Sequence, residues 1–210
     1  MSPRTFAPIL VMLGALSTGC AFGDRHVNLS YPPQRAPAAS SPSNSPASAS
    51  TPEQGIATVV LVDFLDQRSK KTIGDVHNGF GMHTADVVAQ NSVPEWVLGA
   101  VALELEKAGF KVIRAHSIPS AAENSVVTGE VLTAYCASWT KYEGDVSFAA
   151  RVDYKGKEVL RKTYQGKVDS MTNWGASSKS FGLALSIALE NAAKSFAAEL
   201  RRDLPATLPR

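Results

Sequence analysis

Several ionisable side chains gather between residues 66 and 86 of this 210-residue chain. Asp75, His77, His83 and Asp86 could surround a zinc ion, because imidazole and carboxylate groups are common zinc ligands. The sequence around them predicts no regular backbone structure that would fix their spacing. We therefore expect solvated loop side chains here and no bound metal.

Asp66 and Arg68 follow directly after an apolar run and could recognise a ligand as a charged pair. A carboxylate in this position more often accepts N–H bonds from the following turn, so a structural role is favoured. The segment from Ser69 to Asn91 is predicted to be a loop, and loops of this length are usually functional or mobile. Any recognition surface is expected here, with candidate binding residues Asp66, Arg68, His77, Asn78 and His83.

The sequence contains no motif that would support an enzyme. There is no Gly-x-Ser-x-Gly elbow and no glycine loop followed by Lys-Ser or Lys-Thr that would cradle a phosphate. Trp96, Trp139 and Trp174 could line a carbohydrate or peptidoglycan groove, although tryptophan more often packs between helix and sheet. We predict a protein that is not an enzyme and needs no cofactor.

Cys20 is the residue with the most specific predicted chemistry. It follows Arg4, an apolar run from Phe6 to Leu16, and the small residues Ser17 to Gly19. This order is typical of a secretory signal and resembles a bacterial lipoprotein signal, which implies acylation of Cys20. The alternatives are a secretory signal without lipid, or a membrane-spanning helix, for which the apolar run is too short. Ala21 after the cysteine, in place of aspartate, resembles the signal for export to the outer membrane.

Charge and cysteine content exclude other classes of protein. The 21 basic and 19 acidic residues give a net charge of +2 without a basic block, so we expect no nucleic acid partner. With Cys20 acylated, Cys136 has no partner for a disulfide bond. Cys136 lies in an apolar run and is expected to be a buried, inert thiol.

Composition divides the chain into four parts. Residues 1–19 are predicted to be the signal peptide, and residues 20–54 a lipidated cysteine followed by a disordered tether rich in Pro, Ser and Ala. Residues 55–204 form the domain, and residues 205–210 are a tail. The tether would let the domain work at some distance from the membrane.

Hydrophobic periodicity predicts the elements of the domain. A buried strand covers residues 56–64, a helix runs from Ser92 or Val93 to Gly109, and a strand at 110–114 completes a parallel crossover. Strands at 125–138, 145–154 and 157–168 should form an antiparallel meander, and a final helix capped by Ser177 or Ser178 ends at Leu204. We expect a two-layer α/β (α+β) domain, with a mixed sheet of about five strands and two main helices on one face.

The order of these motifs resembles the YajG family of bacterial lipoproteins. The local matches are Asp66-Gln67-Arg68, the helix end from Leu103 to Phe110, and Gly175-Ala176-Ser177-Ser178-Lys179. The resemblance implies a periplasmic lipoprotein with no agreed catalytic residues.

These features together predict a non-enzymatic binding or accessory protein, anchored to the outer membrane through lipid on Cys20 and facing the periplasm. Its partner would be an envelope protein or peptidoglycan, and its oligomeric state is open. The alternative is a tethered activator or adaptor of enzymes that synthesise or remodel peptidoglycan.

Overall fold

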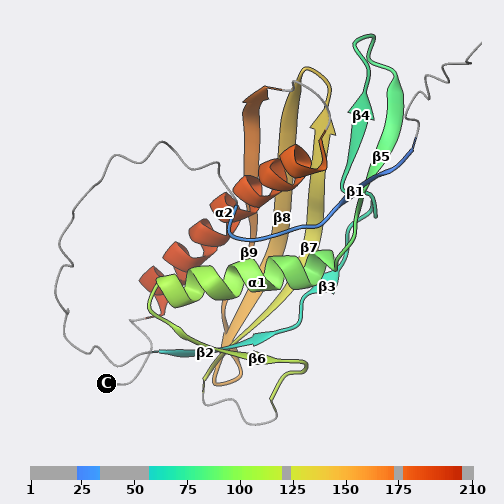
Figure 1. The fold of residues 1–210 in the computed structure, drawn as a ribbon. Coiled ribbons are helices and arrows are strands. Elements are labelled where there is room, and N and C mark those ends of the chain that lie inside the picture. Colours follow the sequence, from blue (N-terminus) through green and yellow to red (C-terminus); the bar gives the residue numbers. More distant parts are fainter. Residues whose placement is uncertain (1–22, 34–56, 120–123, 173–176, 205–210) are drawn as a thin grey trace, which may run out of the picture.

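The computed structural model describes residues 23–33, 57–119, 124–172 and 177–204. In these residues one mixed sheet of nine strands is covered on one face by two helices (Figure 1). The elements in chain order are β1 (Arg25–Val27), β2 (Thr58–Val62), β3 (Leu65–Asp66), β4 (Gly74–His77), β5 (His83–Ala89), α1 (Val93–Lys107), β6 (Lys111–Ala115), β7 (Ser125–Ser138), β8 (Lys141–Tyr154), β9 (Lys157–Thr172) and α2 (Ser178–Asp203). The predicted layers are confirmed, but the predicted number of about five strands is wrong.

The long strands β7, β8 and β9 form the predicted antiparallel meander. The other edge of β7 pairs with three short parallel strands in succession: β2 near its start, β3 in its middle and β4 at its end. β6 extends the sheet from β2, whereas β5 and then β1 extend it from β4. The sheet therefore branches, with one group of short strands at each end of β7 (Figure 1).

β2 and β6 pair in parallel as predicted, and the connection between them contains β3, the β4–β5 hairpin and helix α1. Ser92 is its N-cap, and its side chain accepts a hydrogen bond from the Glu95 backbone N–H. Gly109 follows the helix with φ +93°, a conformation that a residue with a side chain rarely adopts. The predicted start and end of this helix are confirmed.

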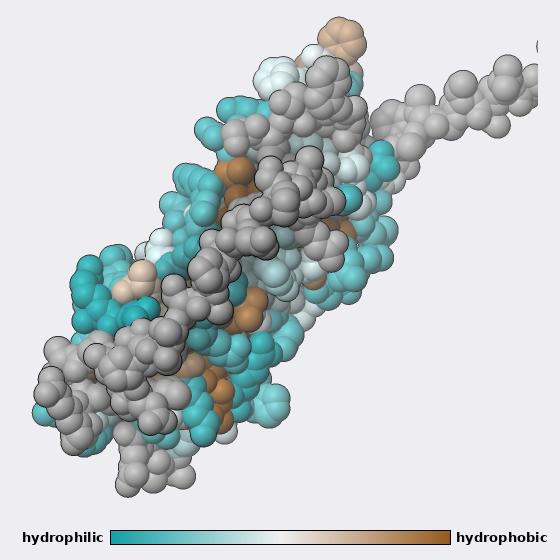
Figure 2. Space-filling view, turned by 60° about the vertical axis from the view of Figure 1, so that its left-hand side comes forward, coloured by the Kyte–Doolittle hydropathy of each residue, from teal (hydrophilic) through white to brown (hydrophobic). Residues whose placement is uncertain are grey.

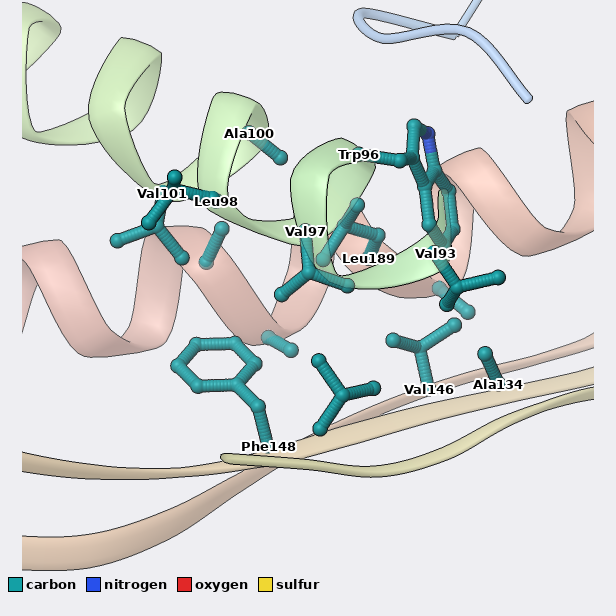
Figure 3. Close-up of a cluster of buried hydrophobic side chains, with 14 of the residues drawn as sticks. Val93, Trp96, Val97, Leu98, Ala100, Val101, Ala134, Val146, Phe148 and Leu189 are labelled. Carbon is teal, nitrogen blue, oxygen red and sulfur yellow. The ribbon is translucent and has the colours of Figure 1, made fainter. Parts of the chain in front are cut away.

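The core lies between the helices and the meander. Figure 3 shows Val97 and Val101 of α1 and Leu189 of α2 above Val146 and Phe148 of β8. Helix α2 approaches the sheet closely because glycines face its alanines: a Cβ at Gly166 would lie 1.9 Å from the Ala188 carbonyl oxygen. The alanines of α2 therefore have the close packing role that their number predicts.

The segment predicted as the loop from Ser69 to Asn91 contains a β-hairpin, so that prediction is wrong. β4 and β5 pair in antiparallel register, with Gly74 opposite Val87 and His77 opposite His83. The strands are short and separated by glycine-rich residues, which hides their alternation in the sequence. Pairing of β4 with β7, 62 residues later in the chain, stabilises the hairpin.

The N-terminal segment up to Pro33 also differs from the prediction of a tether. β1 pairs with β5, and Val27 and Leu29 are buried with 1% and 4% of their surface exposed. Asn91 both accepts from the Leu29 backbone N–H and donates to the Leu29 carbonyl, each at 2.9 Å. The Tyr31 hydroxyl and the Lys107 ammonium both donate to Glu104 Oε1 at 2.6 Å, so this buried carboxylate is paired.

This docking corrects the predicted domain boundary. Residues 23–33 belong to the folded domain, and residues 34–56 connect two parts of the same domain. Cys20 is therefore only five residues from the first strand, and the chain between them is too short to be the predicted long tether. Cys20, the signal segment and the tail at 205–210 lie outside the described residues.

We predict that Asn91→Ala releases the N-terminal segment. The substitution removes two backbone contacts at Leu29, and each such loss costs about 1 kcal/mol or more when the backbone group stays buried. Amide hydrogen exchange should show at least about tenfold faster exchange over residues 25–31. Asn191→Ala is the control, because Asn191 makes one exposed bond to the Lys167 carbonyl. Unchanged protection in Asn91→Ala would show that strand pairing and the contacts of Ser30 and Tyr31 hold the segment without Asn91.

We predict that Gly166→Ala destabilises the domain by about 3 kcal/mol, because the new Cβ would collide with the backbone of α2. Urea unfolding measures the loss. Gly79→Ala is the control, since nothing lies within 4 Å of a Cβ built there. Equal stability of the two variants would contradict the close approach of helix and sheet.

Candidate functional site

The turn between β4 and β5 is organised by Asn78. Its side-chain oxygen accepts from the backbone N–H of Phe80 at 3.0 Å and of Met82 at 3.1 Å. Its own N–H donates to the Met82 carbonyl, and its carbonyl accepts from Gly81 N–H, which has φ +79°. Asn78, predicted as a binding residue, therefore holds the shape of the turn.

This turn presents large apolar side chains to solvent. Phe80 is 90% exposed and Met82 is 59% exposed, and Trp139, from the turn between β7 and β8, is 55% exposed. A Cβ at Gly81 would lie 3.6 Å from the Trp139 ring, so the two turns are in contact. Phe80, Met82 and Trp139 are called the apolar tip below. Figure 2 shows hydrophobic surface projecting at the upper end of the molecule, where Figure 1 places the β4–β5 turn.

The predicted histidines lie directly below the apolar tip. His77 and His83 face each other across the hairpin with ring centroids 6.0 Å apart. His83 Nε2 lies 3.0 Å from Asp86, and His77 Nδ1 lies 3.6 Å from Asp75, whose other oxygen accepts from the Tyr135 hydroxyl at 2.7 Å. Each imidazole therefore has its own carboxylate. Within the described residues, no three His, Cys, Asp or Glu side chains are arranged to hold a metal ion.

Asp66 and Arg68 form a buried turn rather than an exposed recognition pair. The Arg68 side chain is 6% exposed, and its guanidinium donates to both oxygens of Asp66, at 2.9 and 3.0 Å. This pairing, together with Lys71, holds the pKa of Asp66 well below its ordinary value of 3.8. Arg68 also lines a hollow of 220 Å³ on the open face of the sheet, beside Lys70 and Tyr135. The structural role favoured by the sequence fits this geometry.

The other residues singled out in the sequence do not gather at one site. Trp96 is buried in α1 and donates to the Ser30 carbonyl at 3.1 Å, whereas Trp139 is exposed in the apolar tip and Trp174 lies outside the described residues. Trp96 and Trp139 therefore form no common groove. Cys136 is buried as predicted, and burial raises the pKa of its thiol to about 12. In the described part of the chain, no helix has the length and hydrophobicity needed to span a bilayer.

Sequence reasoning missed the apolar tip. The available signal was Gly79-Phe80-Gly81-Met82, in which bulky apolar residues alternate with glycines in a stretch without strand or helix periodicity. Trp139 carried no local signal, because its contact with the hairpin depends on the pairing of β4 with β7. The tip has no nucleophile or paired acid and base, and its chemistry is that of a shaped apolar surface.

We predict that Asp66→Asn destabilises the protein by about 2 kcal/mol at pH 7, because it leaves a buried guanidinium without its carboxylate. The pKa of Asp66 is lowered in the folded protein, so its contribution is complete above about pH 4 and is lost as the pH falls through the folded value. The difference in free energy of unfolding between the wild type and Asp66→Asn should be constant from pH 8 to about 5 and become smaller below about pH 4. Urea unfolding at pH 7 and pH 3 measures it.

Arg68→Met combined with Asp66→Asn is the matched control, because it removes both charges of the pair. This double variant should recover part of the lost stability. A single Asp66→Asn variant as stable as the wild type would show that the pair does not hold the turn.

No protein-family model matches the sequence, and neither does any curated protein. Solved structures do resemble it. The chain is similar to protein XCC0632 from Xanthomonas campestris, of the family DUF330, with a TM-score of 0.52 and 8% identity, covering 88% of this chain and 96% of that chain. It is also similar to protein CT253 from Chlamydia trachomatis, with a TM-score of 0.51 and 12% identity, covering 72% of this chain and 99% of that chain.

The lipoprotein GNA1162 from Neisseria meningitidis matches with a TM-score of 0.36 and 16% identity, covering 62% of this chain and 93% of that chain. We draw no argument from a match at that score. At these identities, the likeness to XCC0632 and CT253 shows a shared fold.

Proposed function

We propose that this protein is a lipid-anchored lipoprotein of the bacterial envelope that acts by binding and not by catalysis. The observation that carries the proposal is the apolar tip. A solvent-exposed cluster of Phe80, Met82 and Trp139 is typical of an interaction surface, because soluble proteins otherwise keep such side chains covered. The turn that carries Phe80 and Met82 is held by Asn78, which lowers the cost of ordering its backbone on binding.

The anchor is supported by the order of the chain. The apolar N-terminal segment precedes Cys20, and the folded domain begins almost immediately after it. Acylation of Cys20 would hold the domain firmly, since two or more acyl chains give stable attachment. The outer membrane as the location, its periplasmic face, and membership of the YajG family are parts of this proposal that rest on the sequence.

The alternative, an activator that reaches distant peptidoglycan enzymes on a long tether, has less support. It requires a flexible spacer between lipid and domain, whereas residues 23–33 dock onto the sheet. The proposed protein therefore works close to the membrane in which it is anchored.

We predict that Cys20→Ala moves the protein from the membrane fraction to the soluble periplasmic fraction, because the acyl chains are lost with the thiol. Fractionation of cells and mass spectrometry of the mature amino terminus measure this. Cys136→Ala is the matched control, since Cys136 is the other cysteine of the chain and is buried; this variant should stay in the membrane fraction. An unmodified Cys20 in the mature protein would contradict the anchor.

A further inference from the structure

The start of β1, the strand that follows the proposed anchor in the chain, lies toward the same end of the molecule as the apolar tip. β1 runs parallel to β5, with Arg25 opposite Val87 and Val27 opposite Ala89. β5 starts at His83 beside the turn and runs away from it, so the chain that precedes Arg25 points toward the turn. In Figure 1 the start of β1 (blue) is its upper end, on the side of the β4–β5 turn.

The distances along the chain allow an acylated Cys20 and the apolar tip to contact the same membrane surface. Arg25 lies opposite Val87, which is four residues along β5 from His83. Four strand residues span about 13 Å. The five residues from Arg25 back to Cys20 span at most about 17 Å when extended. An acylated Cys20 can therefore lie at the height of the hairpin turn, where Phe80 and Met82 project.

The turn has the chemistry that a membrane surface requires. Aromatic side chains favour the interface between lipid headgroups and acyl chains. Backbone groups that enter this region must be hydrogen-bonded internally, and the N–H groups of Asn78, Phe80, Gly81 and Met82 are all bonded within the turn. Of the N–H groups of residues 78–82, that of Gly79 alone has no hydrogen bond, so few backbone N–H groups would lose water when the tip enters a bilayer.

Polar side chains mark the depth at which insertion would stop. His83, paired with Asp86, is about half exposed directly below the turn, and Lys141, paired with Glu143, is similarly exposed two residues after Trp139. These pairs would lie among the headgroups. The tip itself carries no charge, so the attraction is apolar and does not depend on anionic lipid.

We infer that Phe80, Met82 and Trp139 insert into the surface of the bilayer that holds the lipid on Cys20, as a second membrane contact that fixes the orientation of the domain. This inference rests on the proposed function for the position of the anchor. The opposite end of the molecule, with the turn between β8 and β9, would then face away from the membrane (Figure 1).

The test places a fluorescent label beside the tip in the full-length lipidated protein, reconstituted in phosphatidylethanolamine and phosphatidylglycerol vesicles. Gly79→Cys carries an NBD label, because Gly79 has open space around it and the tip residues stay intact. Lys157→Cys, exposed at the start of β9, carries the control label. Cys136 is buried and does not compete for the label.

Nitroxide lipids should quench the label at 79 and leave the label at 157 unaffected, and emission at 79 should shift to the blue. Adding Phe80→Ser and Met82→Ser should abolish both effects while the protein stays anchored. Equal exposure of the two labels to water would overturn the inference. A label at 79 that is shielded in cells but not in pure lipid vesicles would assign the tip to a protein partner, and would also overturn it.

A second measurement separates the tip from the anchor. Cys20→Ala protein produced without residues 1–19 has neither the lipid nor the apolar signal segment, so its partitioning to vesicles reports the tip alone. Adding Phe80→Ser and Met82→Ser should weaken this partitioning by about tenfold or more. Partitioning that is lost with the tip residues supports the inference even if mass spectrometry finds Cys20 unmodified, and equal partitioning of the two proteins overturns it even if Cys20 is acylated.

Discussion

The docking of the N-terminal segment onto the sheet determines how the rest of the molecule is oriented relative to the chain that leads from Cys20, the proposed anchor. β1 pairs with β5, Asn91 holds the Leu29 backbone from both sides, and the Ser30 carbonyl accepts from both Trp96 and Ser186. These contacts join the first residues of the domain to strand β5 and to both helices. Without them the chain after Cys20 would be free, and no end of the domain would have a fixed relation to the membrane.

Much of the fold could be predicted from the sequence where the signal is local. The alternation of Val146, Phe148 and Val152 with polar neighbours identifies β8, and the spacing of Ser92 and Glu95 identifies the start of α1. The parallel crossover follows from the order strand, helix, strand, and the final helix follows from its cap and alanine-rich stripe. These elements need no knowledge of distant contacts, because each carries its own period or cap.

The remaining elements depend on partners far along the chain. β1 has three residues and β3 has two, too short to show alternation, and they are strands only because β5 and β7 supply the pairing. The candidate site likewise depends on contacts between residues far apart in the sequence. Asn78 was identified as a functional residue yet acts by shaping the turn, while Phe80 and Trp139 come together only through the pairing of β4 with β7.

The connection between Pro33 and Ala57 begins and ends in the same folded domain. Its length therefore acts on stability only through the entropy of ring closure, and doubling it would cost about 0.6 kcal/mol. A spacer between lipid and domain would instead set how far the protein reaches. Proteins of this architecture can accordingly differ widely in the length of this proline- and serine-rich insert without any change in the length of chain between Cys20 and β1.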